Sequence, residues 1–324
     1  MKGGRVVVLV LTREEVHELL DMPSVVDAVE SALVQFSLGK TIQPLRLRLF
    51  MPQERSFFVS MPAYLEAMKV VGAKIQTYSG VKTEQGLSGL SAIVALCDPG
   101  SGEFLALMHG TRITEMRCAA AAAVATRHLA LPEAGTLGIL GAGVQGRAHL
   151  WAISAVRPIR TVKVFDILPE RSARYKTEME ERFGLPVEVC ESAKAAVRDC
   201  DVIATVTTSR TPVLERSWLK EGAHINAMGA HTPDTRELDS DTVCGAKLVT
   251  DSLQSLFAES GEALIPIGEG RMTREQVHGE IGEIAAGQKP GRTDSTEITI
   301  FKALGVAVED VVTAKLAYDR ARER

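Results

Sequence analysis

The sequence predicts an α/β protein with two domains, one built on a doubly wound parallel sheet and the other on a mixed sheet. A glycine-rich turn at residues 141–146 separates an apolar run from a helix-like segment. From residue 135 onward strand-like and helix-like segments alternate, whereas several strand-like segments follow one another before residue 108. At 324 residues the chain is longer than a typical single core, so two domains are expected.

The first elements are predicted from the signals at their ends. Residues 1–12 are expected to contain a strand, because their apolar core is too short for a secretory signal and charged residues follow at once. Thr12 and Glu15 have the spacing of a capping box for a short helix to Leu20. Pro23 suits the first turn of a second helix, which ends before Gly39.

The next segment predicts an antiparallel or mixed sheet. Its strand candidates are residues 45–50, 56–60, 70–77, 91–97 and 104–108. A turn rich in glycine and proline, residues 98–102, joins the last two. Thr111 is then expected to cap a long helix over residues 112–129, in which five consecutive alanines permit close approach of another element.

The second half predicts the parallel sheet. Strand candidates are residues 136–140, 162–165, 187–190, 202–206, 224–228 and 247–250, with helical segments between them. Residues 296–301 are compatible with either a strand or a linker. An amphipathic helix is expected over residues 307–322.

The glycine-rich turn predicts a dinucleotide-binding site because its context is complete. A strand precedes it, a helix follows it, and Asp166 ends the next strand about 20 residues further on. Gly141 permits the tight turn, Gly143 lets the backbone approach a pyrophosphate at the helix N-terminus, and Gly146 lets helix and strand pack closely. Asp166 would accept hydrogen bonds from the ribose 2′-hydroxyl, which favours NAD(H) over NADP(H).

Composition excludes several other classes of function. A net charge of −4 gives no electrostatic case for binding nucleic acid or an anionic membrane, and no apolar run reaches membrane-spanning length. The five cysteines are scattered without a C-x-x-C pattern, so neither a disulfide framework nor a metal site is expected. We expect a cytoplasmic protein with thiols in the reduced state.

Three basic residues lie in apolar surroundings outside the predicted nucleotide domain. They are Arg46, Lys74 and Arg117. If they converge, they form a clamp for a carboxylate, since arginine offers a bidentate fork and lysine a point charge. Each of them taken alone is more often a surface side chain whose stem covers apolar neighbours.

These residues belong to segments that resemble the ornithine cyclodeaminase/mu-crystallin family. The match keeps order and spacing over nearly the whole chain, and residues 222–229 (Gly-Ala-His-Ile-Asn-Ala-Met-Gly) are highly specific to the family. The other matching segments are residues 43–46, 61–64 with Lys74, 114–117 with the alanine run, 140–145, 236–238, 281–284 and 304–310.

The resemblance implies a Rossmann domain, residues 119–301, inserted into a substrate-binding and dimerisation domain made of residues 1–118 and 302–324. It makes Arg46, Lys74 and Arg117 the contacts of the substrate carboxylate. The neighbourhood of Gly305 and Val306 would close over nicotinamide and substrate. The positions that match nucleotide contacts, beside the three glycines, are Val144, Gln145, Asp166, Thr207 and Met228, with Arg117 also reaching the cofactor.

Two positions depart from the family pattern. Cyclodeaminases and the archaeal alanine dehydrogenase carry an aspartate two residues after the glycine that matches Gly229, where this chain has His231. A histidine exchanges protons near neutral pH but provides no fixed negative charge for a substrate ammonium. His231 is either catalytic or a solvent-facing loop residue. Gly89 stands where the family tends to place Thr or Ser near the cofactor phosphates, which puts that contact in doubt.

The sequence therefore predicts a homodimeric, NAD(P)H-dependent reductase of small cyclic ketimine carboxylates, such as Δ1-pyrroline-2-carboxylate or Δ1-piperideine-2-carboxylate. Lys74 and His231 are the candidate catalytic residues, with Arg46, Arg117 and Val306 completing the substrate site. NADP(H) stays possible, because Arg171 follows Asp166 closely. The alternatives are ornithine cyclodeamination, alanine dehydrogenation, and a non-catalytic protein that binds a nucleotide or a hormone.

Overall fold

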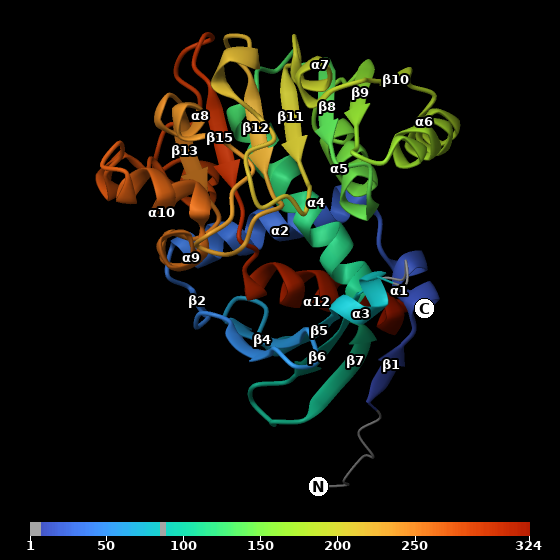
Figure 1. The fold of residues 1–324 in the computed structure, drawn as a ribbon. Helices are drawn as coiled ribbons and strands as arrows, with labels where there is room; N and C mark the ends of the chain where they lie inside the picture. Colours follow the sequence, from blue (N-terminus) through green and yellow to red (C-terminus); the bar gives the residue numbers. More distant parts are fainter. Residues whose placement is uncertain (1–7, 85–88) are drawn as a thin grey trace, which may run out of the picture. The chain divides into compact units, whose positions relative to one another are not determined.

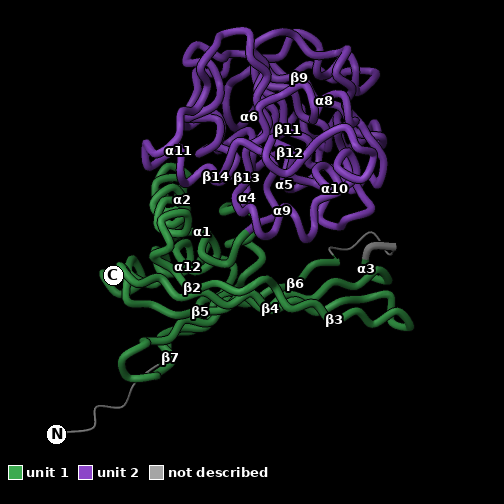
Figure 2. The backbone as a smooth tube through the Cα atoms, turned by 90° about the vertical axis from the view of Figure 1, so that its left-hand side faces the viewer, with its two compact units in different colours: residues 1–117, 306–324 green, residues 118–305 purple. Residues whose placement is uncertain are grey.

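The computed structural model describes residues 8–84 and 89–324. The chain divides into two compact units, which Figure 2 colours separately. Unit 1 comprises Met1–Arg117 with Val306–Arg324, and unit 2 comprises Cys118–Gly305. The helix α4 (Gly110–Leu129) contributes its first residues to unit 1 and the remainder to unit 2.

Unit 1 is a mixed sheet with helices on one face. Its strands follow the order β1-β7-β6-β5-β4-β2, with β3 also paired to β4. Residues of β4 alternate between buried and partly exposed, and the buried set faces α12, which packs against α2, β4 and β5. Its elements are β1 (Leu9–Leu11), α1 (Arg13–Leu19), α2 (Met22–Ser37), β2 (Thr41–Ile42), β3 (Leu47–Met51), β4 (Ser56–Leu65), β5 (Val70–Ser79), α3 (Gly80–Glu84), β6 (Leu90–Cys97), β7 (Phe104–His109) and α12 (Ala307–Glu323).

Unit 2 is a parallel sheet of the order β10-β9-β8-β11-β12-β15-β13-β14, shown in Figure 1 with its helices. Separate apolar clusters lie on its two faces: α5 and α6 contribute to one, and α7 to α10 to the other. Its strands are β8 (Thr136–Leu140), β9 (Thr161–Phe165), β10 (Val187–Val189), β11 (Val202–Thr205), β12 (His224–Ala227), β13 (Lys247–Thr250), β14 (Gly279–Glu280) and β15 (Thr299–Lys302). Its helices are α5 (Val144–Ser154), α6 (Pro169–Phe183), α7 (Ala193–Val197), α8 (Ser240–Cys244), α9 (Leu253–Glu259), α10 (Gly261–Gly268) and α11 (Ile281–Ala285), with 3₁₀ turns at Arg216–Trp218 and Arg274–Gln276.

The predicted fold class is confirmed, and the differences are local. The capping box of Thr12 and Glu15 forms as expected. The prediction that Thr111 caps the long helix is wrong: α4 begins at Gly110, directly after β7, and the Thr114 hydroxyl donates to the Gly110 carbonyl. A side chain at Gly110 would meet the backbone of Ile93 at 2.9 Å, so the strand-to-helix turn there requires glycine. Residues 1–7 of the predicted first strand lie outside the described residues, and β1 begins at Leu9.

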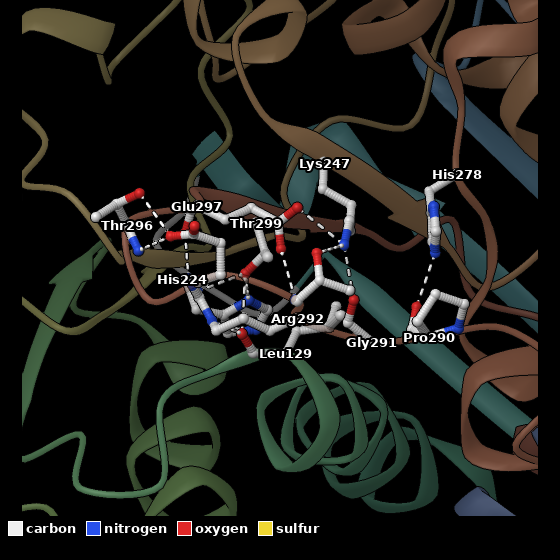
Figure 3. A network of polar contacts seen from close by, with 12 residues as sticks. Leu129, His224, Lys247, His278, Pro290, Gly291, Arg292, Thr296, Glu297 and Thr299 are labelled. Carbon is white, nitrogen blue, oxygen red and sulfur yellow. Dashed lines mark hydrogen bonds and ion pairs between the residues drawn. The ribbon is translucent and has the colours of Figure 1, made fainter.

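The second half of the ambiguous segment 296–301 belongs to β15, a strand inside the sheet between β12 and β13, whereas residues 296–298 precede it. A buried polar network, drawn in Figure 3, fixes its start. The His224 ring bonds the Thr299 hydroxyl at 2.9 Å, and that hydroxyl donates to the Leu129 carbonyl at 3.2 Å. Arg292 donates to Thr299 and also to Leu129, so the end of α4 is tied to both strands.

Candidate active site

The C-terminal ends of the parallel strands in unit 2 carry most of the predicted nucleotide-binding residues. From β8 the chain proceeds through β9 to β10 on one side of the sheet, and returns to β11 and β12 on the other. Ligands of doubly wound sheets bind at this switch in direction, outside the carboxyl ends of the strands. Gly141 follows β8 there, Thr207 follows β11 and Met228 follows β12.

Each glycine of the turn has a distinct structural reason. Gly141 has φ +106°, and a side chain on it would meet the Val206 carbonyl oxygen at 2.8 Å. A side-chain carbon on Gly146 would lie 2.4 Å from the Gly141 carbonyl oxygen, so strand and helix approach closely here. Gly143 is the N-cap of α5, and a carbon placed on it would meet no described atom within 4 Å. The open space beside Gly143 therefore lies at the helix N-terminus, where backbone N–H groups bind phosphates.

Asp166 directly follows β9 and bonds the glycine turn. Its carboxylate accepts from the Ala142 N–H at 2.9 Å and from the Leu168 N–H at 3.0 Å, one bond to each oxygen. Each carboxylate oxygen has a second lone pair. Asp166 thus stabilises the turn, and each of its oxygens keeps a lone pair for a further donor. Arg171, one turn into α6, is exposed.

A buried glutamate that the sequence analysis did not single out holds two of the loops. Glu237 accepts from the Thr207 N–H and hydroxyl at 2.7 Å each, and from the Gly229 N–H at 2.7 Å. The Thr205 hydroxyl donates to it as well. Burial raises the pKa of Glu237, an effect opposed by Lys302 and by these hydrogen bonds. Because the neighbours around its two oxygens all donate, the geometry fits the carboxylate form.

Lys302 and Glu262 extend this cluster toward the loop that carries His231. Both side chains are fully buried, with Lys302 Nζ 3.4 Å from Glu262 Oε2. Lys302 also donates to the Ala230 carbonyl at 2.6 Å, and Glu262 accepts from the Glu237 N–H at 2.9 Å. His231 itself is exposed, in the loop after β12. Buried Lys302 thus holds the loop backbone at Ala230, while His231 next to it is exposed to solvent.

In unit 1 the structure brings Lys74 and Arg117 together on the first turn of α12. Lys74 Nζ lies 3.0 and 2.9 Å from the two oxygens of Asp310. Arg117 donates to Asp310 at 3.0 Å through Nε and to Glu309 at 2.7 Å through Nη1. Both acids are fully buried. Two cations and two anions therefore form one cluster beneath the helix, and the two acids were missed by the sequence analysis.

Val306 and the segment that carries Arg46 are connected to the same end of α12. Val306 is buried and is the N-cap of α12. Gln43, three residues before Arg46, accepts from the Val308 N–H at 2.9 Å, so the segment that carries Arg46 is tied to the first turn of α12. Arg46 is half-buried. Residues 86–88 lie outside the described residues, and Gly89 accepts from the Ser79 N–H at 2.9 Å.

Comparison with known proteins assigns the chain to a family. A sequence profile of the ornithine cyclodeaminase/mu-crystallin family matches residues 6–324. The chain belongs to this family. Among curated members, the Δ1-pyrroline-2-carboxylate reductase of Bacillus cereus is 36% identical over 317 residues, which are 98% of this chain and 97% of the relative.

Solved structures of other family members share the fold over nearly the whole chain. The Thermococcus litoralis Δ1-pyrroline-2-carboxylate reductase, in complex with NADH and L-proline, is 41% identical with a TM-score of 0.95, covering 98% of both chains. An archaeal alanine dehydrogenase dimer with bound NAD is 36% identical with a TM-score of 0.92, covering 98% of this chain and 96% of that one. Within the described ranges 8–84 and 89–324, no helix has both the length and the apolarity to cross a membrane.

Proposed function

We propose that the protein reduces small cyclic ketimine carboxylates, such as Δ1-pyrroline-2-carboxylate or Δ1-piperideine-2-carboxylate, to cyclic amino acids with NAD(H). The observation that carries this function is the full-length likeness to a reductase whose structure holds NADH and L-proline. L-Proline is the product of reducing Δ1-pyrroline-2-carboxylate. The cations Lys74 and Arg117 supply the chemistry that binding such a carboxylate requires.

The residues of unit 2 fit a dinucleotide. The N–H groups that begin α5 would hold the pyrophosphate, and the open space at Gly143 leaves room for it. Val144, Gln145 and Gly146 belong to this turn, while Thr207 and Met228 would lie along the nicotinamide half. When bound, NADH supplies the hydride that reduces the C=N carbon.

We propose that NADH is preferred over NADPH. The Asp166 carboxylate would accept from the ribose hydroxyls and repel a 2′-phosphate. Its bonds to the Ala142 and Leu168 N–H groups fix its orientation at the end of β9. Arg171 on α6 is the nearest candidate in sequence for a contact with a 2′-phosphate.

The substrate carboxylate would bind to Arg46, Lys74 and Arg117. Asp310 and Glu309 hold Lys74 and Arg117 in place through buried ion pairs. Val306, at the N-cap of α12, would close over the substrate ring. Such positioning of reactants supplies several kcal/mol of barrier lowering in enzymes generally.

Reduction of the imine also needs a proton at nitrogen. His231 is an exposed imidazole at the C-terminal edge of the sheet, and it would donate this proton either directly or through water. Lys74, which is protonated when paired with Asp310, is the other candidate donor. An iminium that binds already protonated requires only hydride.

We further propose that unit 1 forms a homodimer. The sheet face opposite α2 and α12 is apolar: one row across its strands runs through Pro62, Ala73, Ala95, Leu107 and Val10. Val10 is 65% exposed. Contiguous apolar surface of this kind marks an interface.

The variant Leu107→Glu tests this interface, because it places a charge on the apolar face. Light scattering should show a monomer for this variant and a dimer for the unmodified protein. A dimer that persists in this variant would place the interface elsewhere.

The function is tested by a screen of substrates with both cofactors. Oxidation of NADH and NADPH is followed with Δ1-pyrroline-2-carboxylate, with Δ1-piperideine-2-carboxylate, and with pyruvate plus ammonia. Ammonia release is followed with ornithine and NAD. Steady NADH oxidation with a cyclic ketimine supports the proposal. Faster turnover of pyruvate plus ammonia would assign alanine dehydrogenation, and NADH binding without turnover of any substrate would assign a binding protein.

A further inference from the structure

An arginine on α5 lies behind the glycine turn instead of facing the expected ligand. Arg147 donates through Nη1 to the carbonyls of Ala142 and Gly143, the second at 3.1 Å. Through Nε it donates to Glu178 Oε2 on α6 at 2.5 Å. Its side chain is 22% exposed. One guanidinium thus bonds two successive peptide groups of the turn and an acid on the next helix.

These contacts help to fix the direction of two N–H groups, together with the helix bond from the Arg147 N–H to the Gly143 carbonyl at 3.3 Å. In a trans peptide the C=O and the N–H point in opposite directions, and every described peptide bond here is trans. The carbonyls of Ala142 and Gly143 share their peptide planes with the N–H groups of Gly143 and Val144. With both carbonyls directed at Arg147, the two N–H groups face away from it, at the helix N-terminus where Gly143 borders open space.

The position of Arg147 is unfavourable for the helix itself. It lies in the first turns of α5, where the helix dipole favours negative side chains and disfavours positive ones. Glu178 offsets this charge. Burial tends to raise the pKa of Glu178, but its hydrogen bonds with Arg147 and Arg174 hold that pKa below its ordinary value.

Tyr175 completes the support from α6. Its ring centre lies 5.5 Å from the Arg147 guanidinium, and its hydroxyl donates to the Gly146 carbonyl at 3.2 Å. The ring is fully buried, and burial raises the pKa of Tyr175. The turn is therefore held at the Ala142 and Gly143 carbonyls by Arg147, and at the Gly146 carbonyl by Tyr175.

We propose that Arg147, oriented by Glu178, is a positioning residue for the cofactor pyrophosphate: it directs the Gly143 and Val144 N–H groups toward the phosphates without touching them. The role presupposes the binding of NAD(H) proposed above. Preformed N–H donors bind an anion more tightly because no reorganisation opposes binding.

The test is direct titration of NADH and of ADP-ribose, which has the pyrophosphate but lacks nicotinamide. In Arg147→Ala the Kd of both should rise by about tenfold, the loss expected when two donors are no longer preorganised. The rate at saturating NADH and ketimine should stay within about threefold of the unmodified protein, since the reacting groups are untouched. Glu178→Gln, which keeps Arg147, should show a smaller rise in both Kd values.

Arg174→Ala is the matched control. Arg174 also donates to Glu178, at 2.5 Å, but it is 77% exposed and does not bond the turn. Its loss should leave both Kd values unchanged. If Arg147 acts by orienting N–H groups, the ratio of mutant to unmodified Kd will persist from about 0.05 to about 0.5 M salt, whereas simple attraction between charges would be screened.

Several results would overturn the role. They are unchanged ADP-ribose binding in Arg147→Ala, a Kd ratio that vanishes at high salt, or equal effects of Arg174→Ala and Glu178→Gln. If Arg147→Ala does not fold, the same titrations of NADH and ADP-ribose with Glu178→Gln test the role of Arg147. An unmodified protein that binds NADH but reduces no ketimine would contradict the proposed reaction alone, whereas one that does not bind NADH would overturn both.

Discussion

Lys74 donates to Asp310 at 3.0 Å although 236 positions separate them in the sequence. Lys74 lies on β5 and Asp310 in the first turn of α12, so this ion pair joins a central strand of unit 1 to the last helix. Arg117 binds the same carboxylate. The two cations proposed to bind the substrate are thus held in place by an acid from the other end of the chain.

We expect Asp310→Asn to destabilise the protein by about 3–5 kcal/mol, because it removes the buried carboxylate that both Lys74 and Arg117 bind. Urea unfolding measures this loss. The control is Asp319→Asn on the same helix, whose partner Lys315 lies 2.6 Å away, with the two side chains 48% and 21% exposed; breaking this more exposed pair should cost about 0.5 kcal/mol or less. Similar losses of unfolding free energy in the two variants would show that the buried ion pair stabilises the protein no more than the more exposed one.

For Arg117→Lys we expect a raised KM for the ketimine with smaller effects on NADH binding. Lysine keeps the charge but lacks the fork that contacts Glu309 and Asp310 together. Weakening a buried charged contact of this kind costs up to about 2–5 kcal/mol of transition-state stabilisation, read from kcat/KM. Thermal unfolding must be measured alongside, since Arg117 also stabilises unit 1. Unchanged kcat/KM would remove Arg117 from the proposed substrate site.

Asp166→Asn tests the cofactor preference. The amide oxygen can still accept from the Ala142 N–H, while the bond from the Leu168 N–H and the negative charge are lost, so thermal unfolding is measured alongside. The ratio of kcat/KM for NADH to that for NADPH should favour NADH in the unmodified protein and fall in the variant. A higher kcat/KM with NADPH in the unmodified protein would refute the preference.

The glycine turn and Asp166, on which the proposed nucleotide site depends, were predictable because their constraints are local. Gly141, Gly143, Gly146 and Asp166 lie within one strand–helix–strand unit, and each has a requirement of backbone geometry or charge that sequence spacing reveals. The strand order near the turn follows from the same alternation. The three glycines therefore appear where the pattern placed them.

The supporting acids were not predictable in the same way. Glu309 and Asp310 fit the first turn of any helix, where acidic residues are common, and their partner Arg117 lies more than 190 positions earlier. Glu237 lies in a loop whose sequence gives no sign that four donors surround it. Burial of these carboxylates depends on tertiary contacts, and a single sequence with no structure does not show it.

Unfolding stability should decline as the pH falls below about 6.5, owing to two buried histidines. Burial lowers the pKa of His224 to about 3 and that of His149 to about 4, from 6.5, and Arg292 also disfavours the charged form of His224. Between these values the unfolded chain binds protons that the folded chain does not, so stability present above pH 6.5 is lost on acidification.

Each histidine should contribute about 1.4 kcal/mol per pH unit to this loss within its window. Unfolding free energies at several pH values between about 6.5 and 4.5 measure the slope, since carboxylates titrate mainly below that range. If His224→Asn folds, the slope of unfolding free energy against pH should fall by the contribution of one histidine. The same measurement on His149→Gln is an independent check. A flat profile over this range would show that both rings are protonated in the folded protein.

His231 bears on the direction of the reaction. A cyclodeaminase must take a proton from a substrate ammonium and hold the iminium that follows, and a carboxylate favours both steps. A neutral imidazole that takes the proton becomes a cation beside a cation, whereas an imine reductase needs only a proton source. The unmodified protein should therefore reduce a cyclic ketimine with NADH and release little or no ammonia from ornithine with NAD.

The variant His231→Asp tests this argument. Position 231 is exposed, and Lys302 holds the loop backbone through the Ala230 carbonyl, so the variant should fold. It should gain some release of ammonia from ornithine. Thr232→Ala at the neighbouring position is the control and should gain none. Robust formation of proline and ammonia from ornithine by the unmodified protein would contradict the role assigned to this histidine.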